Sequence, residues 1–203
     1  GSFGDLGCFS FHPRKVITTG EGGIITTNND ELDDKLRKLR NHGMEYYENK
    51  NDFVSVGFNS RMTEMQAAIG IVQMYKIDEI ISKRQKLAQL YTELLSKVSW
   101  IKTPQTINGA NHIYQSYVIL LKTGINRDRL IDKLRELGIE TNIGTYAIHQ
   151  TKYYRNKYGF NANDFPNARI AFEQSMALPL YPKMTEDDLI HISQKLIEVG
   201  NRQ

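Results

Sequence analysis

A lysine close to the start of the chain stands in a stretch that could support amine chemistry. Lys15 follows the alternating segment 8–12, and Pro13 ends that segment because proline has no N–H for a sheet ladder. Glycines within 20–23 permit a turn before the apolar run 24–27. We therefore expect Lys15 on a tight loop between two strands. A lysine there is normally a solvated surface group, whereas a buried, neutral amine can form a Schiff base.

The stretch 10–23 reads Ser-Phe-His-Pro-Arg-Lys-Val-Ile-Thr-Thr-Gly-Glu-Gly-Gly. It closely resembles the lysine segment of the DegT/DnrJ/EryC1/StrS family, which are pyridoxal-phosphate (PLP) sugar aminotransferases of the aspartate-aminotransferase fold. The match is long and nearly free of gaps, so it is more specific than a lone glycine motif. The resemblance implies that Lys15 attaches the cofactor covalently and that Ser10 hydrogen-bonds its phosphate. Glu21, the only acid near Lys15 in sequence, is interpreted as a turn residue that shapes the glycine-rich loop.

A second resemblance covers 56–70, Val-Gly-Phe-Asn-Ser-Arg-Met-Thr-Glu-Met-Gln-Ala-Ala-Ile-Gly. In the family, the asparagine of this loop reaches across a dimer to the partner's PLP phosphate, and here that position is Asn59. A side-chain amide can donate hydrogen bonds to phosphate oxygens, and Arg61 would be a nearby cation that contacts the substrate. The alternatives are a turn asparagine that satisfies local backbone and a surface ion pair for Arg61.

Two further candidates for substrate binding lie near the end of the chain. The segment 146–150 resembles the family segment beside the sugar pocket and implies a role for His149, although a lone histidine is often a structural hydrogen-bonding group. Tyr153 belongs to a run of tyrosines and cations over 152–158. Such a cluster could stack on a base or pair with a diphosphate, or it could be a solvated helix face.

Capping residues and apolar spacing predict the elements that must position these residues. Thr63 and Gln66 form a capping box that starts a long helix, which we expect to break near Tyr75. We expect 44–52 to be a loop. Other expected elements are a helix capped by Asn29 or Asp30 and ended by Gly43, a strand at 117–121, a helix from Asn126 to Gly138, a short strand at 139–142, a helix opening at 165–166, a closing strand at 177–182 and a helix capped by Thr185.

Composition excludes several classes of protein. The 203 residues are 40% hydrophobic and 24% charged, which is ordinary for a globular protein, and the net charge of +3 is too small to indicate nucleic-acid binding. No apolar run approaches the length of a membrane span, and the scattered histidines have no metal-ligand spacing. A single Cys8 suits a reducing, cytoplasmic compartment, and we expect it to be a small buried hydrophobe.

The chain opens without a methionine or a visible signal peptide. Family members are about twice as long, with their lysine near the middle, so we expect this chain to be a C-terminal half. Residues 1–75 would be the end of the PLP-binding large domain. Residues 76–203 would be a linking helix and a small C-terminal α/β domain.

The resemblance thus implies an α/β fragment of a fold type I PLP transferase. Its parent would be a homodimer with a shared active site that converts a nucleotide-linked keto-sugar to an amino-sugar, with glutamate as the donor and with no nucleic-acid or membrane partner. One alternative is a PLP-dependent sugar dehydratase of the same family, but those members replace the lysine with histidine, and Lys15 argues against it. Another is a non-catalytic binding or regulatory relative.

Overall fold

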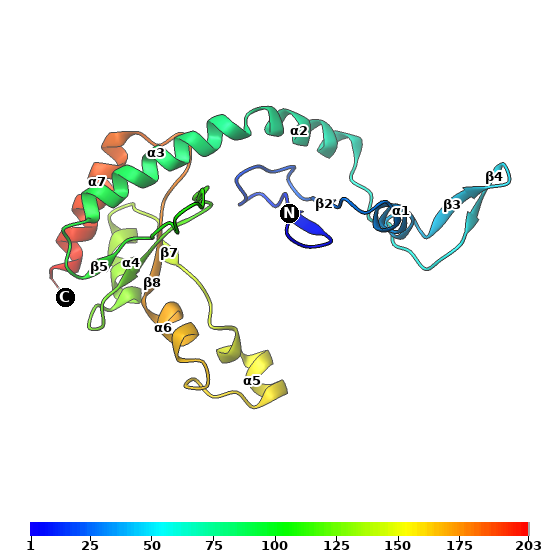
Figure 1. Cartoon of the computed structure of the whole chain (residues 1–203). Coiled ribbons are helices and arrows are strands. Elements are labelled where there is room, and N and C mark those ends of the chain that lie inside the picture. The colour runs from blue at the N-terminus through cyan, green and yellow to red at the C-terminus, as the bar shows by residue number, and fades with distance from the viewer. Residues whose placement is uncertain (203) are drawn as a thin grey trace. The chain divides into compact units, whose positions relative to one another are not determined.

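The structure is a computed structural model that describes residues 1–202. The chain forms two compact units, Gly1–Asp78 and Glu79–Gln203, and the boundary between them falls in the first turn of α3 (Figure 1). The first unit contains β1 (Gly7–Ser10), β2 (Gly23–Thr26), α1 (Asp30–Leu39), β3 (Met44–Tyr47), β4 (Lys50–Phe53) and α2 (Glu64–Tyr75). From α3 onward the elements are α3 (Ile77–Leu95), β5 (Ile101–Lys102), β6 (Tyr117–Leu121), α4 (Arg127–Glu136), β7 (Asn142–Ile143), the 3-10 turn η1 (Ile148–Gln150), α5 (Lys152–Tyr158), α6 (Pro166–Gln174), β8 (Ser175–Leu178) and α7 (Glu186–Gly200).

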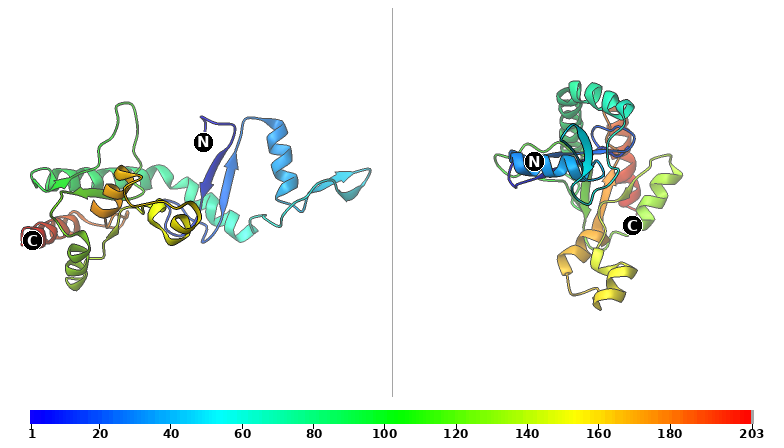
Figure 2. Two further views of the ribbon diagram at one scale, coloured as in Figure 1. Left: turned by 90° about the horizontal axis from the view of Figure 1, so that it is seen from below. Right: turned by 90° about the vertical axis from the view of Figure 1, so that its right-hand side faces the viewer.

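The first unit opens with the antiparallel pair of β1 and β2, whose register runs from Gly7↔Thr26 to Ser10↔Gly23. The Lys15 segment is therefore the connection between two paired strands, as the sequence predicts. α1 follows β2, as the left view of Figure 2 shows, and Asn29 Oδ1 caps it by accepting from the Leu32 N–H at 3.1 Å. The prediction that Cys8 is buried is wrong, because the residue is exposed on a two-stranded sheet too narrow to bury both faces.

The prediction of a loop over 44–52 is also wrong. β3 and β4 form an antiparallel hairpin in which Tyr47 pairs with Lys50. Glu48 and Asn49 make the two-residue turn with φ of 49° and 62°, the positive values that a type I′ turn requires. The turn pair contains no glycine, so the usual sequence signal of a tight hairpin is missing.

The long helix breaks where the sequence predicts. Thr63 caps α2: its Oγ1 accepts from the Gln66 N–H at 3.3 Å, while Gln66 Oε1 accepts from the Thr63 N–H at 3.0 Å. α2 ends at Tyr75 and α3 begins at Ile77. This capping box and this break confirm both expectations.

A four-stranded antiparallel sheet with strand order β5-β6-β8-β7 forms the centre of the second unit. The strand expected at 117–121 is confirmed as β6. The closing strand lies earlier than expected, as β8, and ends before Pro179, which has no N–H to extend the ladder. In contrast, β7 lies later than the strand expected at 139–142, because it begins at the last residue of that range and continues to Ile143.

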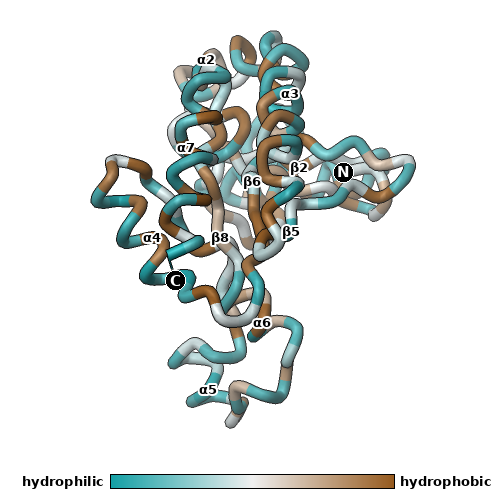
Figure 3. Tube along the Cα trace, turned by 90° about the vertical axis from the view of Figure 1, so that its left-hand side faces the viewer, coloured by the Kyte–Doolittle hydropathy of each residue, from teal (hydrophilic) through white to brown (hydrophobic). Residues whose placement is uncertain are grey.

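Alternation along β6 shows which face of the sheet carries the core. Tyr117, Ile119 and Leu121 are at most 1% exposed, whereas Val118 and Leu120 are only partly buried. Figure 3 shows apolar stretches on α3 and α7 beside this sheet, and α4 packs against α7. The helices contribute to one cluster with β6 through Leu87, Ala88, Tyr91, Leu95, Leu130, Ile131, Leu134, Leu189, Ile192 and Leu196.

Buried tyrosines link α3 to the sheet. The rings of Tyr91 and Tyr117 lie 5.0 Å apart, and the Tyr91 hydroxyl donates to the Pro179 carbonyl oxygen at 3.0 Å. Burial raises the pKa of Tyr91 and raises the pKa of Tyr117 to about 12. Both phenols therefore stay neutral near physiological pH, as a core position requires.

The predicted caps of the later helices are confirmed. Asn126 Oδ1 accepts from the Arg129 N–H at 2.9 Å to start α4, and Thr185 with Asp188 forms a capping box that starts α7. The helix expected to open at 165–166 is α6. Within residues 1–202, none of the helices has the length and apolar content to cross a membrane.

Candidate functional site

Lys15 lies on a turn that follows β1. Its backbone N–H donates to the His12 carbonyl oxygen at 2.9 Å, and the His12 N–H donates to Ser10 Oγ at 3.2 Å. Among residues 1–202 the Lys15 amine has no hydrogen bond or ion pair, and the residue is exposed. The fold thus fixes the backbone of this lysine and leaves its amine accessible, which agrees with the expectation of a solvated surface group and not with a buried amine.

Two threonines close the base of the Lys15 loop. Thr18 Oγ1 and the Thr19 N–H both donate to the Phe11 carbonyl oxygen, at 2.8 and 3.1 Å, and the Phe11 N–H donates to the Gly22 carbonyl oxygen at 2.9 Å. Thr19 is only 4% exposed. The two ends of the loop are therefore tied together, and this is the geometry that the pattern around Pro13 and the glycines predicts.

Glu21 acts in this loop through its backbone. Its carbonyl oxygen accepts from Thr19 Oγ1 at 2.7 Å and from Gln66 Nε2 at 2.9 Å, while its carboxylate lies 3.9 Å from His12 Nε2 with both side chains exposed. This arrangement supports the interpretation of Glu21 as a turn residue. Gln66 was not expected in the site, because its capping-box signal indicated only a helix start.

Asn59 and Arg61 lie in the segment that leads into α2. This segment is fixed to the end of α1 by backbone contacts: the Phe58 N–H donates to the Leu39 carbonyl oxygen at 2.7 Å, and Asn59 forms an antiparallel bridge with Asn41. The Asn59 and Arg61 residues are exposed, and Arg61 forms no ion pair within residues 1–202. Their predicted roles therefore stay predictions, with side chains free to contact a ligand or another subunit.

His149 is buried in the second unit and only 6% exposed. Its Nε2 lies 3.2 Å from the Ala162 carbonyl oxygen, and its ring lies 5.0 Å from the ring of Phe165. A carbonyl can only accept, so this contact selects the tautomer with the proton on Nε2. These contacts support the structural interpretation of His149, and its role in substrate binding stays a prediction.

Tyr153 lies on α5 and is 62% exposed. Lys157 Nζ donates to its hydroxyl at 3.1 Å and lies 5.5 Å from its ring centroid and 5.3 Å from that of Tyr158. The cation therefore lies at the hydroxyl end of the Tyr153 ring and close to the Tyr158 ring. An exposed surface of this kind is compatible with both interpretations of the cluster, a stacking surface and a solvated helix face.

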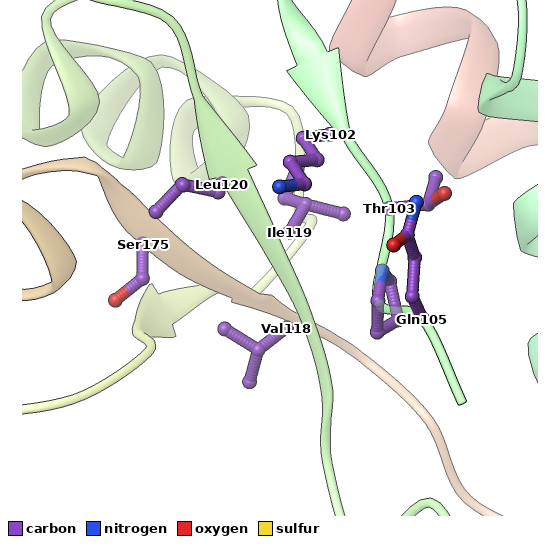
Figure 4. A pocket seen from close by; sticks show the side chains of 8 residues that line it. Lys102, Thr103, Gln105, Val118, Ile119, Leu120 and Ser175 are labelled. Carbon is purple, nitrogen blue, oxygen red and sulfur yellow. The ribbon is translucent and has the colours of Figure 1, made fainter. Parts of the chain in front are cut away.

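Two cavities in the second unit do not include any of these residues. One, of about 300 Å³, lies against β6 and is lined by 102–105, 118–120 and Ser175 (Figure 4). The other, of about 390 Å³, lies between α3 and the segment from Pro104 to Tyr114. Ser10, Lys15, Asn59 and Arg61 belong to the first unit, and His149 and Tyr153 to the second.

The groups around Lys15 fit a phosphate-bearing aldehyde such as PLP. Lys15 offers an accessible primary amine, and Ser10 Oγ already accepts a bond from the His12 N–H, so its own proton is available to a phosphate oxygen. Among residues 1–202, no three His, Cys, Asp or Glu side chains gather in a way that could hold a metal ion.

Comparison with known proteins gives one consistent result. The model of the DegT/DnrJ/EryC1/StrS aminotransferase family matches residues 1–197. GDP-perosamine synthase of Caulobacter vibrioides is 35% identical over 202 residues, which cover 98% of this chain and 53% of that protein. The spore coat polysaccharide biosynthesis protein SpsC of Bacillus subtilis is 32% identical over 212 residues, which cover 98% of this chain and 54% of that protein.

A solved structure gives the fold. Helicobacter pylori PseC, an aminotransferase involved in the biosynthesis of pseudoaminic acid, superimposes with a TM-score of 0.92 at 24% identity, over 99% of this chain and 54% of that one. The expected α/β fold, that of a part of a fold type I PLP aminotransferase, is confirmed. The chain spans about half the length of the curated relatives it matches.

Proposed function

The chain belongs to the DegT/DnrJ/EryC1/StrS aminotransferase family, and from this we propose that the full-length protein is a PLP-dependent aminotransferase acting on a nucleotide-linked keto-sugar. One observation carries the proposal: the segment that resembles the family's lysine segment forms a hydrogen-bonded loop between β1 and β2, and Lys15 lies on that loop. Glutamate would be the amino donor. The names of two relatives, a GDP-perosamine synthase and a polysaccharide biosynthesis protein, support a sugar substrate.

Lys15 has two roles in this proposal. Its Nζ attaches the cofactor, and after the donor amine displaces it, the free Nζ takes the proton from the substrate carbon and later returns one. PLP, when bound, supplies the electron sink for this chemistry. The hydrogen bond from the Lys15 N–H to the His12 carbonyl oxygen fixes the backbone of Lys15, so only the side chain must move between attaching the cofactor and transferring the proton.

The remaining residues orient the cofactor and the substrate. The Ser10 hydroxyl donates to the cofactor phosphate, and the Asn59 amide donates to the phosphate held by a partner subunit, so the parent protein is a dimer with shared sites. Arg61, two residues after Asn59, contributes positive charge toward the substrate. His149 and Tyr153 contact the sugar nucleotide, with the exposed ring of Tyr153 as a stacking surface.

The test uses the full-length protein with PLP and borohydride reduction. Because reduction makes the link between the amine and the cofactor permanent, peptide mapping should find the cofactor on Lys15. A Lys15→Ala variant should lose that label and its transamination, whereas Lys50→Ala, a change at an exposed lysine of the β4 strand, should retain both. Labelling of a different lysine in the wild-type protein would contradict the assignment.

A further inference from the structure

We propose that Gln66 is a positioning residue for Lys15, because one amide side chain joins the start of α2 to the loop that carries the lysine. The inference rests on the proposed function of Lys15. It concerns a contact between residues 45 positions apart, within the first unit.

The two ends of the Gln66 amide have different partners. Oε1 accepts from the Thr63 N–H and lies at the same distance, 3.0 Å, from Thr63 Oγ1, which completes the cap of α2. Nε2 points the other way and donates to the Glu21 carbonyl oxygen at 2.9 Å. The amide therefore satisfies the helix terminus with its acceptor and holds the Lys15 loop with its donor.

Close packing beside the Gln66 amide also joins the Lys15 loop to the first turns of α2. A Cβ atom added to Gly70 would lie 3.2 Å from the Thr19 methyl carbon, and one added to Gly22 would lie 2.9 Å from the Met62 methyl carbon. The loop therefore lies in close contact with α2 and with the segment just before it, and there is little room for a side chain at Gly70. Thr19 Oγ1 also donates to the Glu21 carbonyl oxygen, so that oxygen accepts from both the loop and the helix.

The same contact connects two predicted parts of the cofactor site. Residues 59–62 lead directly into the Thr63 cap, and this segment carries Asn59 and Arg61. Through Gln66, the cap is joined to the loop that ends the Ser10–Lys15 stretch. A loss of the Nε2 bond would let the loop move relative to α2 without unwinding the helix.

The chemistry of the contact requires glutamine and not glutamate. Either side chain completes a capping box, because only an acceptor oxygen is needed there. A glutamate at this position would turn a carboxylate oxygen toward the Glu21 carbonyl oxygen, and two acceptors cannot share a hydrogen bond. Gln66→Glu therefore separates the tether from the cap, while Thr63→Ala weakens the cap and leaves the tether.

The experiment compares these two variants with the wild-type full-length protein. Two readouts are used: the PLP concentration that gives half-maximal reductive labelling of Lys15, and amide hydrogen exchange over 11–22 without PLP. In Gln66→Glu the half-maximal concentration should rise about fivefold to tenfold, the effect of one lost hydrogen bond, and exchange at the Thr19 amide should become faster. In Thr63→Ala both readouts should match the wild type although its melting temperature falls.

The inference would be overturned if Gln66→Glu matched the wild type in both readouts. It would also be overturned if Thr63→Ala changed the half-maximal PLP concentration and the exchange over 11–22 as much as Gln66→Glu does. If the wild-type protein carries no label on Lys15, the proposed function fails, and exchange over 11–22 still decides whether Gln66 holds the loop. The two ideas therefore fail in different ways.

Discussion

At the scale of single residues, Arg84 shows how a buried charge joins α3 to two distant segments. Its Nη1 donates to the carbonyl oxygens of Tyr114 and Leu180, both at 3.0 Å, and the residue is 7% exposed. Burial lowers the pKa of Arg84. The guanidinium is thus a structural donor, and its bond to the Leu180 carbonyl oxygen is buried.

We expect Arg84→Ala to destabilise the protein by about 3 kcal/mol, because it removes the side-chain packing and the buried hydrogen bond to the Leu180 carbonyl oxygen. The measurement is the free energy of unfolding by urea, followed by circular dichroism. Lys86→Ala, on an exposed position of the same helix, is the control and should change stability by no more than about 0.5 kcal/mol. If the two changes lowered the free energy of unfolding equally, the buried contacts of Arg84 would not contribute to stability.

The sequence predicted some residue positions and not others. Pro13 and the following glycines predicted that Lys15 lies on a loop between two strands, because both residue types act locally on the backbone. Gln66 was missed as a partner of that loop, since nothing in a capping box reports a contact with Glu21. The prediction that Cys8 is buried was wrong for a related reason. Strand alternation shows which residues share a face of the sheet, but it does not show whether other residues cover that face.

At the scale of elements, helices were easier to predict than strands. Asn29, Thr63, Asn126 and Thr185 each cap a helix as expected, because a cap and an apolar period are signals carried by neighbouring residues. Strand pairing depends on a distant partner. The β3–β4 hairpin was taken for a loop, and β8 lies earlier than expected.

The β3–β4 turn leads to a prediction at this scale. Glu48 has a φ of 49°, a conformation that costs a residue with a Cβ atom about 1 kcal/mol and costs glycine little. Glu48→Gly should therefore slow amide exchange across residues 44–53 about fivefold. Glu48→Ala, which keeps the Cβ atom, should not slow it. Faster exchange in the glycine variant would show that its greater freedom in the open state outweighs the relief of strain.

At the scale of the whole molecule, the two units differ in how much apolar surface they bury. The core cluster lies in the second unit, whereas Ile17 is the one buried large hydrophobic residue of the first unit within the described chain. Side chains such as Phe9, Ile24, Met65 and Ile69 are exposed there. The α/β fold class was predicted from the resemblance to the family, and the caps and apolar spacing of the second unit agreed with it. Which side chains of the first unit are exposed could not be predicted, because burial depends on contacts between distant segments that no local pattern encodes.

The proposed sharing of the site between subunits gives the last prediction. If each site uses its own Lys15 and the partner's Asn59, a mixture of two inactive variants should regain activity. Equal amounts of Lys15→Ala and Asn59→Asp subunits form hybrid dimers half the time, and each hybrid has one site with both residues intact, so about one quarter of wild-type activity should return. Asp keeps the shape of Asn but cannot donate to a phosphate.

The mixture is first denatured and refolded together, and mass spectrometry of the native dimers verifies that hybrids form. Activity is then followed as amino transfer from glutamate. The two variants refolded separately and then combined are the control, and they should stay inactive because each dimer then lacks one residue in both of its sites. If Asn59 acted on the Lys15 of its own chain, hybrids would contain no intact site. Verified hybrids without activity would therefore show that the site is not shared, because only a contribution across the dimer lets one subunit supply what the other has lost.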